Sequence, residues 1–327
     1  MAVPVGIAGI AHYVPDRVID NEYFTRFVDT SDEWIRQRSG IRQRRWLADD
    51  QATSDMFVAA GAKALERAGV APEEVDLIVA GTVSPDYLFP AAACLVQDRL
   101  GCVHAAAFDL SAACPGFLYA LSTGAQFIAA GTCRNVLVLG GEALSRMIDL
   151  KDRSSCVLFG DGAGAAVLQP HADCGQGRIE DIFLGTDGSG AELIIRRYGG
   201  SRHPLTPEVL ERGDHCLRMK GREVYRFAVE KMTELMAWAM KDQDPKELGW
   251  VVPHQVNARI LDTATERLDI PPEKVVVNID RYGNTSAASI PIILSELWEA
   301  GRLESGKFLV LAAFGAGLTW AGARIRW

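Results

Sequence analysis

The sequence lacks the cysteine patterns of disulfide-stabilised and zinc-binding proteins. Its seven cysteines are odd in number and show no C-x-x-C spacing, so we expect neither a disulfide framework nor a metal site. This usage is typical of a reducing compartment, and we predict a cytoplasmic protein. Residues 284–286 (NTS) match a glycosylation sequon, but the match requires a secreted protein and is discarded.

An excess of positive charge and a membrane-anchoring segment are also missing. The chain has 34 basic and 42 acidic side chains, a net charge of −8, which argues against nucleic acid as a partner. Residues 1–14 have no basic region and carry Pro4, Gly6 and Gly9, so they predict a strand and a turn rather than a signal peptide. The uncharged run 110–133 is rich in Ala, Ser, Gly and Thr, which favours a helix in a protein core over a membrane span.

What the chain does contain is an α/β pattern. Its 327 residues are 48% hydrophobic and 23% charged, values typical of a folded globular protein. Short aliphatic runs alternate with longer helical patterns, which indicates an α/β architecture. The predicted strands lie at 75–80, 106–108, 136–139, 163–168, 250–252, 275–277 and 308–313.

The two halves of the chain repeat the same order of elements. In each half a Pro-Glu or Pro-Lys turn, at 72–74 and 245–247, leads into a strand. From Ile78 to Val138 is 60 positions, and from Val251 to Val310 is 59. A duplicated α/β unit would give this spacing, as would two unrelated segments of similar length. We divide the chain into halves 1–170 and 171–327, and we expect the irregular stretch 185–214 to be a surface excursion that covers a site.

Three side chains at predicted strand ends are candidates for chemistry. Cys114 precedes Pro115 and the helical run that starts at Gly116, so a helix dipole would lower the pKa of its thiol and favour a nucleophile. His254 follows the 250–252 strand, at the end where catalytic groups of α/β sheets collect. Asn284 lies in a loop before a helix. A buried hydrophobic cysteine, a structurally satisfied histidine and a turn asparagine are the alternatives.

Two glycine-rich stretches and several basic residues rank lower. The glycines of 160–164 match no dinucleotide or phosphate fingerprint and favour tight packing. The loop after the 308–313 strand, at 314–320, has backbone N–H groups suited to an oxyanion. Arginines cluster at 36–45, and basic residues recur at 218–222; each cluster fits either an acidic partner or a solvated face.

Together these segments resemble the ketoacyl-acyl-carrier-protein synthase III branch of the thiolase superfamily, from Gly6 to the C-terminus. The matching motifs are 29–35 (DTSDEWI), 39–42 (SGIR), 112–117 (AACPGF), 159–166 (FGDGAGAA), 253–257 (PHQVN) and 282–289 (YGNTSAAS). The resemblance implies a duplicated five-layered αβαβα fold and a homodimer. It also implies that acyl-CoA is a substrate, that an acidic acyl carrier protein is the partner, and that no cofactor is needed.

The resemblance assigns roles to individual residues. Cys114 would carry the acyl group, and His254 and Asn284 would stabilise the enolate formed when a malonyl thioester loses carbon dioxide. The backbone N–H groups of Cys114 and Ala316 would form an oxyanion hole. The remaining assignments are Trp34, Arg153, Arg222 and Asn257 for coenzyme A, Arg259 for the carrier protein, and Phe89, Leu144, Phe159, Ile194 and Leu217 for the acyl pocket, with Phe89 supplied across the dimer.

The sequence departs from the family pattern at a few positions. Ala316 stands in place of a glycine, and Arg222 replaces a smaller polar residue near the expected pantetheine path. The 185–214 excursion contains Arg196, Arg197 and Arg202, which a purely apolar primer tunnel would not require. An unusual primer fits these changes. An acyltransferase, or a ketosynthase of specialised metabolism with a different acceptor, stays open as the alternative; a non-catalytic scaffold is disfavoured by the intact Cys, His and Asn set.

Overall fold

A five-stranded sheet forms the first half of the protein, whose computed structural model describes residues 3–327. The strand order is β1-β7-β6-β4-β5. The pairs β1/β7 and β7/β6 are antiparallel, and β6/β4 and β4/β5 are parallel. The strands are β1 (Val5–Tyr13), β4 (Leu77–Gly81), β5 (Ala106–Leu110), β6 (Val136–Glu142) and β7 (Gly162–Pro170).

A second sheet repeats this topology. Its order is β11-β12-β13-β8, with β8/β13 and β13/β12 antiparallel and β12/β11 parallel. The strands are β8 (Arg178–Thr186), β11 (Leu248–Pro253), β12 (Phe308–Gly315) and β13 (Thr319–Arg326). The matching order confirms the predicted duplication. Val251 and Val310, the two residues compared in the second half, are paired across β11 and β12. In the first half Ile78 pairs with Leu137, one residue before the Val138 used in that comparison.

The strand predicted at 275–277 is wrong. Only Val275 makes an isolated parallel bridge, to Val251, in the place that β5 holds in the first sheet. The 3-10 helix η6 (Pro272–Lys274) ends just before it and α9 (Ile279–Tyr282) begins four residues after it. The extended segment between them is too short to form a ladder.

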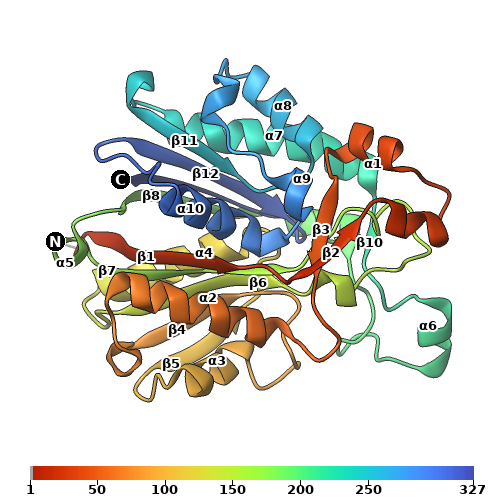
Figure 1. Cartoon of the computed structure of the whole chain (residues 1–327), viewed down its shortest axis with the longest axis horizontal. Helices are drawn as coiled ribbons and strands as arrows, with labels where there is room; N and C mark the ends of the chain where they lie inside the picture. Colours follow the sequence, from red (N-terminus) through yellow and green to blue (C-terminus); the bar gives the residue numbers. More distant parts are fainter. Residues whose placement is uncertain (1–2) are drawn as a thin grey trace.

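Helices and sheets alternate in five layers (Figure 1). The helices α2 (Thr53–Ala68) and α3 (Ala92–Leu100) cover the outer face of the first sheet, and α7 (Gly221–Met240) and α8 (Ala258–Glu266) cover that of the second. Between the sheets lie α4 (Gly116–Ala129) and α10 (Ser289–Glu299). The 110–133 run is therefore a core helix, as predicted. No helix among residues 3–327 is long and apolar enough to cross a membrane.

Several of the remaining elements gather at one end of the layers, on the right of Figure 1. They include β2 (Arg17–Asp20), β3 (Gln43–Trp46) and α1 (Asp32–Ser39). The predicted excursion contains η4 (Gly188–Leu193), β9 (Ile194–Ile195) and α6 (Pro207–Arg212), and β9 pairs with β10 (Arg218–Met219). The other short helices are η1 (Glu22–Arg26), η2 (Pro72–Glu74), η3 (Leu144–Arg146), α5 (His171–Cys174), η5 (Pro245–Glu247) and η7 (Ser286–Ala288). The predicted boundary at 170/171 stays a prediction, although the two sheets draw their strands from either side of it.

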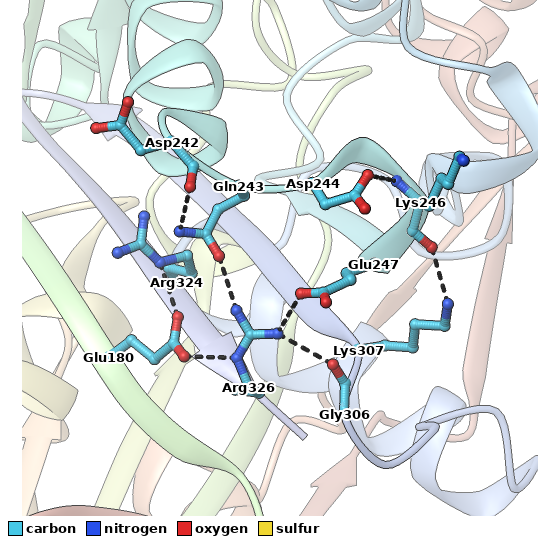
Figure 2. Close-up of polar contacts among 10 residues, drawn as sticks. All are labelled: Glu180, Asp242, Gln243, Asp244, Lys246, Glu247, Gly306, Lys307, Arg324 and Arg326. Carbon is cyan, nitrogen blue, oxygen red and sulfur yellow. Dashed lines mark hydrogen bonds and ion pairs between the residues drawn. The ribbon is translucent and has the colours of Figure 1, made fainter.

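An ion-pair network fixes the C-terminal strand (Figure 2). Glu180 on β8 accepts from Arg324 Nε at 2.9 Å and from Arg326 Nε at 2.6 Å. Arg326 also donates to Glu247 at 2.9 Å and to Gln243 at 2.7 Å. The network joins the edge strand β8 to β13 and to the turn between α7 and β11.

Candidate active site

Cys114 lies in a tight turn between β5 and α4. Ala113 has a φ of +50°, a left-handed conformation that costs a non-glycine residue energy. The Gly116 N–H donates to the Ala113 carbonyl at 2.7 Å, and α4 starts at Gly116, as predicted, with Pro115 as its N-cap. The turn presents the thiol at the N-terminus of a buried helix.

The loop after β12 packs directly against this turn. A Cβ on Gly315 would lie 2.7 Å from the Cys114 backbone nitrogen, so only glycine permits this approach. Thr319 Oγ1 lies 2.9 Å from the carbonyl oxygens of both Ala112 and Ala316, and its single proton is donated to one of them at a time. These contacts hold Ala316 beside Cys114, which brings the two predicted oxyanion-hole residues together.

His254 is delivered by β11 and is buried. Its N–H donates to the Ala312 carbonyl at 2.8 Å, and its Nδ1 lies 3.0 Å from Ser289 Oγ. Its Nε2 has no hydrogen-bond partner among the described residues. Ser289 Oγ also lies 3.3 Å from Thr285 Oγ1, so the hydroxyl can either donate to Nδ1 or accept from it. Either imidazole tautomer is therefore accommodated, with Nε2 open to a ligand.

Asn284 is fixed by its backbone and by one end of its amide. Its N–H donates to the Leu158 carbonyl at 2.8 Å, and its carbonyl accepts from Gly160 at 3.0 Å. Its Oδ1 accepts from the Ser286 N–H at 2.9 Å. Because the oxygen is used there, Nδ2 is the end of the side chain that can donate to a ligand.

Burial controls the protonation of the site. Burial raises the pKa of the Cys114 thiol to about 12, although hydrogen bonding from Ser286 opposes the shift. The expectation of a lowered thiol pKa is therefore wrong for the unliganded site, because desolvation outweighs the helix dipole. Burial also lowers the pKa of His254 to about 3. The resting pair is a neutral thiol and a neutral imidazole.

A buried carboxyl lies next to this pair. Glu142 ends β6 and accepts from Thr82 Oγ1 at 3.0 Å, from the Val83 N–H at 3.0 Å and from Ser84 Oγ at 2.5 Å. Burial raises its pKa to about 7, and its negative charge contributes to the raised pKa of Cys114. Sequence reasoning missed Glu142, although its place at the carboxyl end of a predicted strand was a signal.

One cavity of about 330 Å³ unites most of the predicted residues. Its lining includes Cys114, His254, Asn284 and Ala316, and four of the five predicted acyl-pocket residues: Leu144, Phe159, Ile194 and Leu217. Leu144 and Phe159 pack with Met147 in one hydrophobic cluster. The excursion also contributes Ile195, Arg196, Tyr198, Gly199 and Gly200, so it covers the site as expected.

Phe89 is the predicted acyl-pocket residue outside this cavity. It is 86% exposed, and Tyr87 and Leu88 beside it are exposed as well. Within one chain Tyr87 and Phe89 therefore protrude from the loop between β4 and α3, whereas Leu88 borders the cavity.

The residues predicted to bind coenzyme A have mixed surroundings. The Arg153 guanidinium lies 5.0 Å from the centre of the Trp34 ring. An aromatic ring inserted between them requires about 7 Å, which is twice a carbon contact distance, so the present gap is too narrow. Arg153 would have to swing outward to admit a base. Asn257 caps α8 by accepting from the Arg259 N–H at 3.0 Å, and it donates to the Arg38 carbonyl at 2.9 Å. Arg222 and Arg259 are exposed.

Comparisons with known proteins agree with this geometry. Residues 108–188 match the family model described as 3-oxoacyl-[acyl-carrier-protein (ACP)] synthase III, and residues 239–327 match its C-terminal model. A beta-ketoacyl-[acyl-carrier-protein] synthase III of Desulfitobacterium hafniense (strain DSM 10664 / DCB-2) is 49% identical, covering 99% of this chain and 98% of its own length.

Two solved structures illustrate the range of similar proteins. The 3-oxoacyl-[acyl-carrier-protein] synthase III of Aquifex aeolicus VF5 superposes with a TM-score of 0.89 at 42% identity, covering 99% of this chain and 100% of the other. The priming beta-ketosynthase from the R1128 polyketide biosynthetic pathway has a TM-score of 0.90 at 36% identity, covering 99% and 96%. Sequence and structure therefore match over nearly the full length.

Proposed function

The chain belongs to the β-ketoacyl-[acyl-carrier-protein] synthase III family, and from this premise we propose how its residues divide the work. It is an acyl-transferring condensing enzyme that joins the acyl group of an acyl-CoA to malonyl-acyl carrier protein in fatty acid initiation. The observation that carries our assignment is the single cavity in which Cys114 meets the open Nε2 of His254 and Asn284.

The first half-reaction loads Cys114. His254 Nε2 accepts the thiol proton while Sγ attacks the thioester carbonyl, because neither group is charged at rest. The N–H groups of Cys114 and Ala316 stabilise the oxyanion. Its collapse expels the coenzyme A thiolate, which takes the proton from His254, and the acyl group remains on Cys114.

The second half-reaction forms the carbon–carbon bond. Loss of carbon dioxide from the malonyl thioester leaves an enolate, and its oxygen accepts hydrogen bonds from His254 Nε2 and Asn284 Nδ2. The enolate carbon attacks the Cys114 thioester, the thiolate leaves, and the 3-oxoacyl product stays on the carrier protein. Ser289 supports both steps, since its hydroxyl serves either tautomer of His254. No cofactor is required.

Binding of the two substrates is assigned to the end of the molecule near α1 and α8. Trp34, Arg153 and Arg222 would hold coenzyme A, with Asn257 fixing the N-terminus of α8 beside them. Arg259 is exposed on the first turn of α8, and it would bind an acidic carrier protein through charge-assisted contacts.

A homodimer is part of the proposal. The outer edge of β5 is unpaired within the chain, and Tyr87, Leu88 and Phe89 give the loop after β4 an exposed apolar surface. A second copy of the chain covers both by pairing β5 with β5 and burying this surface. Phe89 then contributes to the acyl pocket of the partner. All seven cysteines are free, which supports a cytoplasmic location.

Intact-mass analysis of Cys114 tests the assignment. Incubation with acetyl-CoA should add one acetyl group to the wild type and none to Cys114→Ser, because a serine hydroxyl is far less ionised than the thiol. Circular dichroism checks that the variant is folded. An acetyl adduct of the same stoichiometry on folded Cys114→Ser would place the nucleophile elsewhere.

The alternative is a ketosynthase of specialised metabolism. The similarity to the priming ketosynthase at 36% identity favours it as the second candidate. The two differ in their carrier protein, so comparing condensation rates with fatty acid and polyketide carrier proteins separates them.

A further inference from the structure

Among the described residues that line the main cavity, Arg196 is the only charged one, and the others are apolar, small or neutral polar. It lines the 330 Å³ cavity together with Leu144, Phe159 and Leu217. A second hollow of about 480 Å³ adjoins it and shares Val83, Leu88, Met147 and Arg196 with it. Arg196 therefore lies where the apolar pocket opens into a more polar space.

The guanidinium of Arg196 has capacity left for a ligand. Its Nε donates to the His215 carbonyl at 2.9 Å, and no acid among the described residues lies within ion-pair distance of it. The neighbouring Arg197 differs: it is paired with Glu192 and lines a separate hollow on the outside of the excursion. The hydrogen bond to His215 steadies Arg196 while its two terminal nitrogens stay free to donate.

The acids of the second hollow do not neutralise Arg196. Asp86 is occupied by the Ser54 N–H at 2.9 Å and Ser54 Oγ at 2.7 Å. Asp49 is fully exposed and lies 4.0 Å from Arg146 and 3.9 Å from Arg17. The remaining positive charge at the junction of the two cavities is that of Arg196.

We propose that Arg196 recognises the distal carboxylate of a dicarboxylic acyl group carried on Cys114. The methylene chain would lie against Leu144, Phe159 and Leu217, and the terminal carboxylate would pair with the two free nitrogens of Arg196, a geometry that guanidinium favours. An acyl chain with a terminal methyl gains nothing from this contact. The substrate class is thus an acyl-CoA with an ω-carboxylate, and the inference rests on the proposed function of Cys114.

Two acyl-CoA substrates of equal carbon number test the proposal. Glutaryl-CoA and pentanoyl-CoA differ at the far end by a carboxylate in place of a methyl group. Initial rates of Cys114 acylation are measured by intact mass for the wild type, Arg196→Leu and Arg197→Leu. Acetyl-CoA, which has no distal carboxylate, serves as the reference for the basic acyl transfer.

The expected result is a change in ratio. Arg196→Leu should lower the glutaryl-to-pentanoyl rate ratio about fivefold, the upper end for an ion pair whose cation is exposed. Arg197→Leu should leave the ratio unchanged. Equal ratios in all three proteins, or acylation of the wild type by acetyl-CoA and pentanoyl-CoA but not glutaryl-CoA, would overturn the inference. If none of the three acyl-CoA substrates, acetyl-CoA included, acylates Cys114 of the wild type, the proposed function is overturned instead.

Discussion

Asn284 touches only the second half-reaction in the proposed mechanism. Its Oδ1 is held by the Ser286 N–H, so its contribution is one N–H donor aimed into the cavity. Asn284→Ala removes that donor, and carbon dioxide release from malonyl carrier protein should fall about a hundredfold or more. Acylation of Cys114, which uses the backbone oxyanion hole, should continue at a similar rate.

The matched control is Asn284→Asp, which keeps the acceptor for Ser286 but loses the donor. It should show the same separation between the two steps as Asn284→Ala. If both variants slow acylation and decarboxylation equally, Asn284 maintains the structure of the site rather than stabilising an enolate.

Glu142 makes the stability of the enzyme depend on pH. Burial raises the pKa of its carboxyl to about 7, above its unfolded value of 4.5. Its protonated form therefore favours the folded state, and this contribution is complete below about pH 4.5 and is lost as the pH rises through 7. Glu142→Gln removes this titration. The free energy of unfolding of Glu142→Gln minus that of the wild type should therefore be larger at pH 8 than at pH 5, by about 2 kcal/mol.

Urea unfolding at the two pH values measures this difference. Glu66→Gln, at an exposed position of α2, is the control for the loss of one carboxyl group. A stability difference between Glu142→Gln and the wild type that is the same at pH 5 and pH 8 would contradict the predicted titration.

At the scale of single residues, the sequence predicts which residues form the site better than it predicts their burial and pKa. The motifs around Cys114, His254 and Asn284 identify the three residues that share the cavity. They do not predict the raised pKa of the thiol, because desolvation depends on how α4 and β12 pack around it. Glu142 was missed for the same reason: its burial becomes visible only when β4 and β6 pair.

The C-terminal strand β13 depends on the ion-pair network around Glu180 (Figure 2). The side chains of Glu180 and Arg326 are 19% and 27% exposed, so their pairing is partly protected from water and stronger than a surface pair. Arg326→Leu should lower the free energy of unfolding by about 1–3 kcal/mol. Acylation of Cys114 should be unchanged in the folded variant.

An exposed ion pair provides the comparison. Arg134 lies 3.2 Å from Asp173, and its side chain is 70% exposed. Arg134→Leu should change the free energy of unfolding by less than about 0.5 kcal/mol. Chemical denaturation of both variants checks the ranking, and equal losses would show that the network adds nothing beyond a surface pair.

Element order was predictable where the hydrophobic runs were long. The strands around Val138, Val251 and Val310 form where expected, and their shared spacing gives the duplication. The 275–277 strand failed because a short β-branched run fits a single bridge as well as a ladder. The distinction depends on η6 and α9, whose positions the run itself does not encode.

In the proposed dimer, the assembly of the whole molecule depends on the edge strand β5. The Ala106 N–H donates to Asp76 and the Leu110 carbonyl accepts from Thr82, so the even-numbered residues of β5 face β4 and the Ala107 N–H faces outward. Ala107→Pro removes this outward donor without breaking the β4–β5 ladder. It should convert the proposed dimer largely to monomer, as measured by light scattering after size-exclusion chromatography.

Ala107→Val is the control, because it keeps the N–H and a strand-favouring side chain. It should remain dimeric. A wild-type protein that is monomeric at micromolar concentration, or an Ala107→Pro variant that stays fully dimeric, would show that β5 is not the dimer contact.

Because Val275 forms only a single bridge, the corresponding edges of the two sheets differ in their ability to pair with a further strand. The first sheet ends in a five-residue strand with a free edge, whereas at the corresponding place the second ends in one bridged residue. A molecule with two equally adhesive edges could add copies at both and grow into a filament. In the proposed dimer the partner occupies the outer edge of β5, and the shortened repeat offers no second strand of this kind for a further copy. The duplication that built the fold thus does not duplicate the proposed β5 contact.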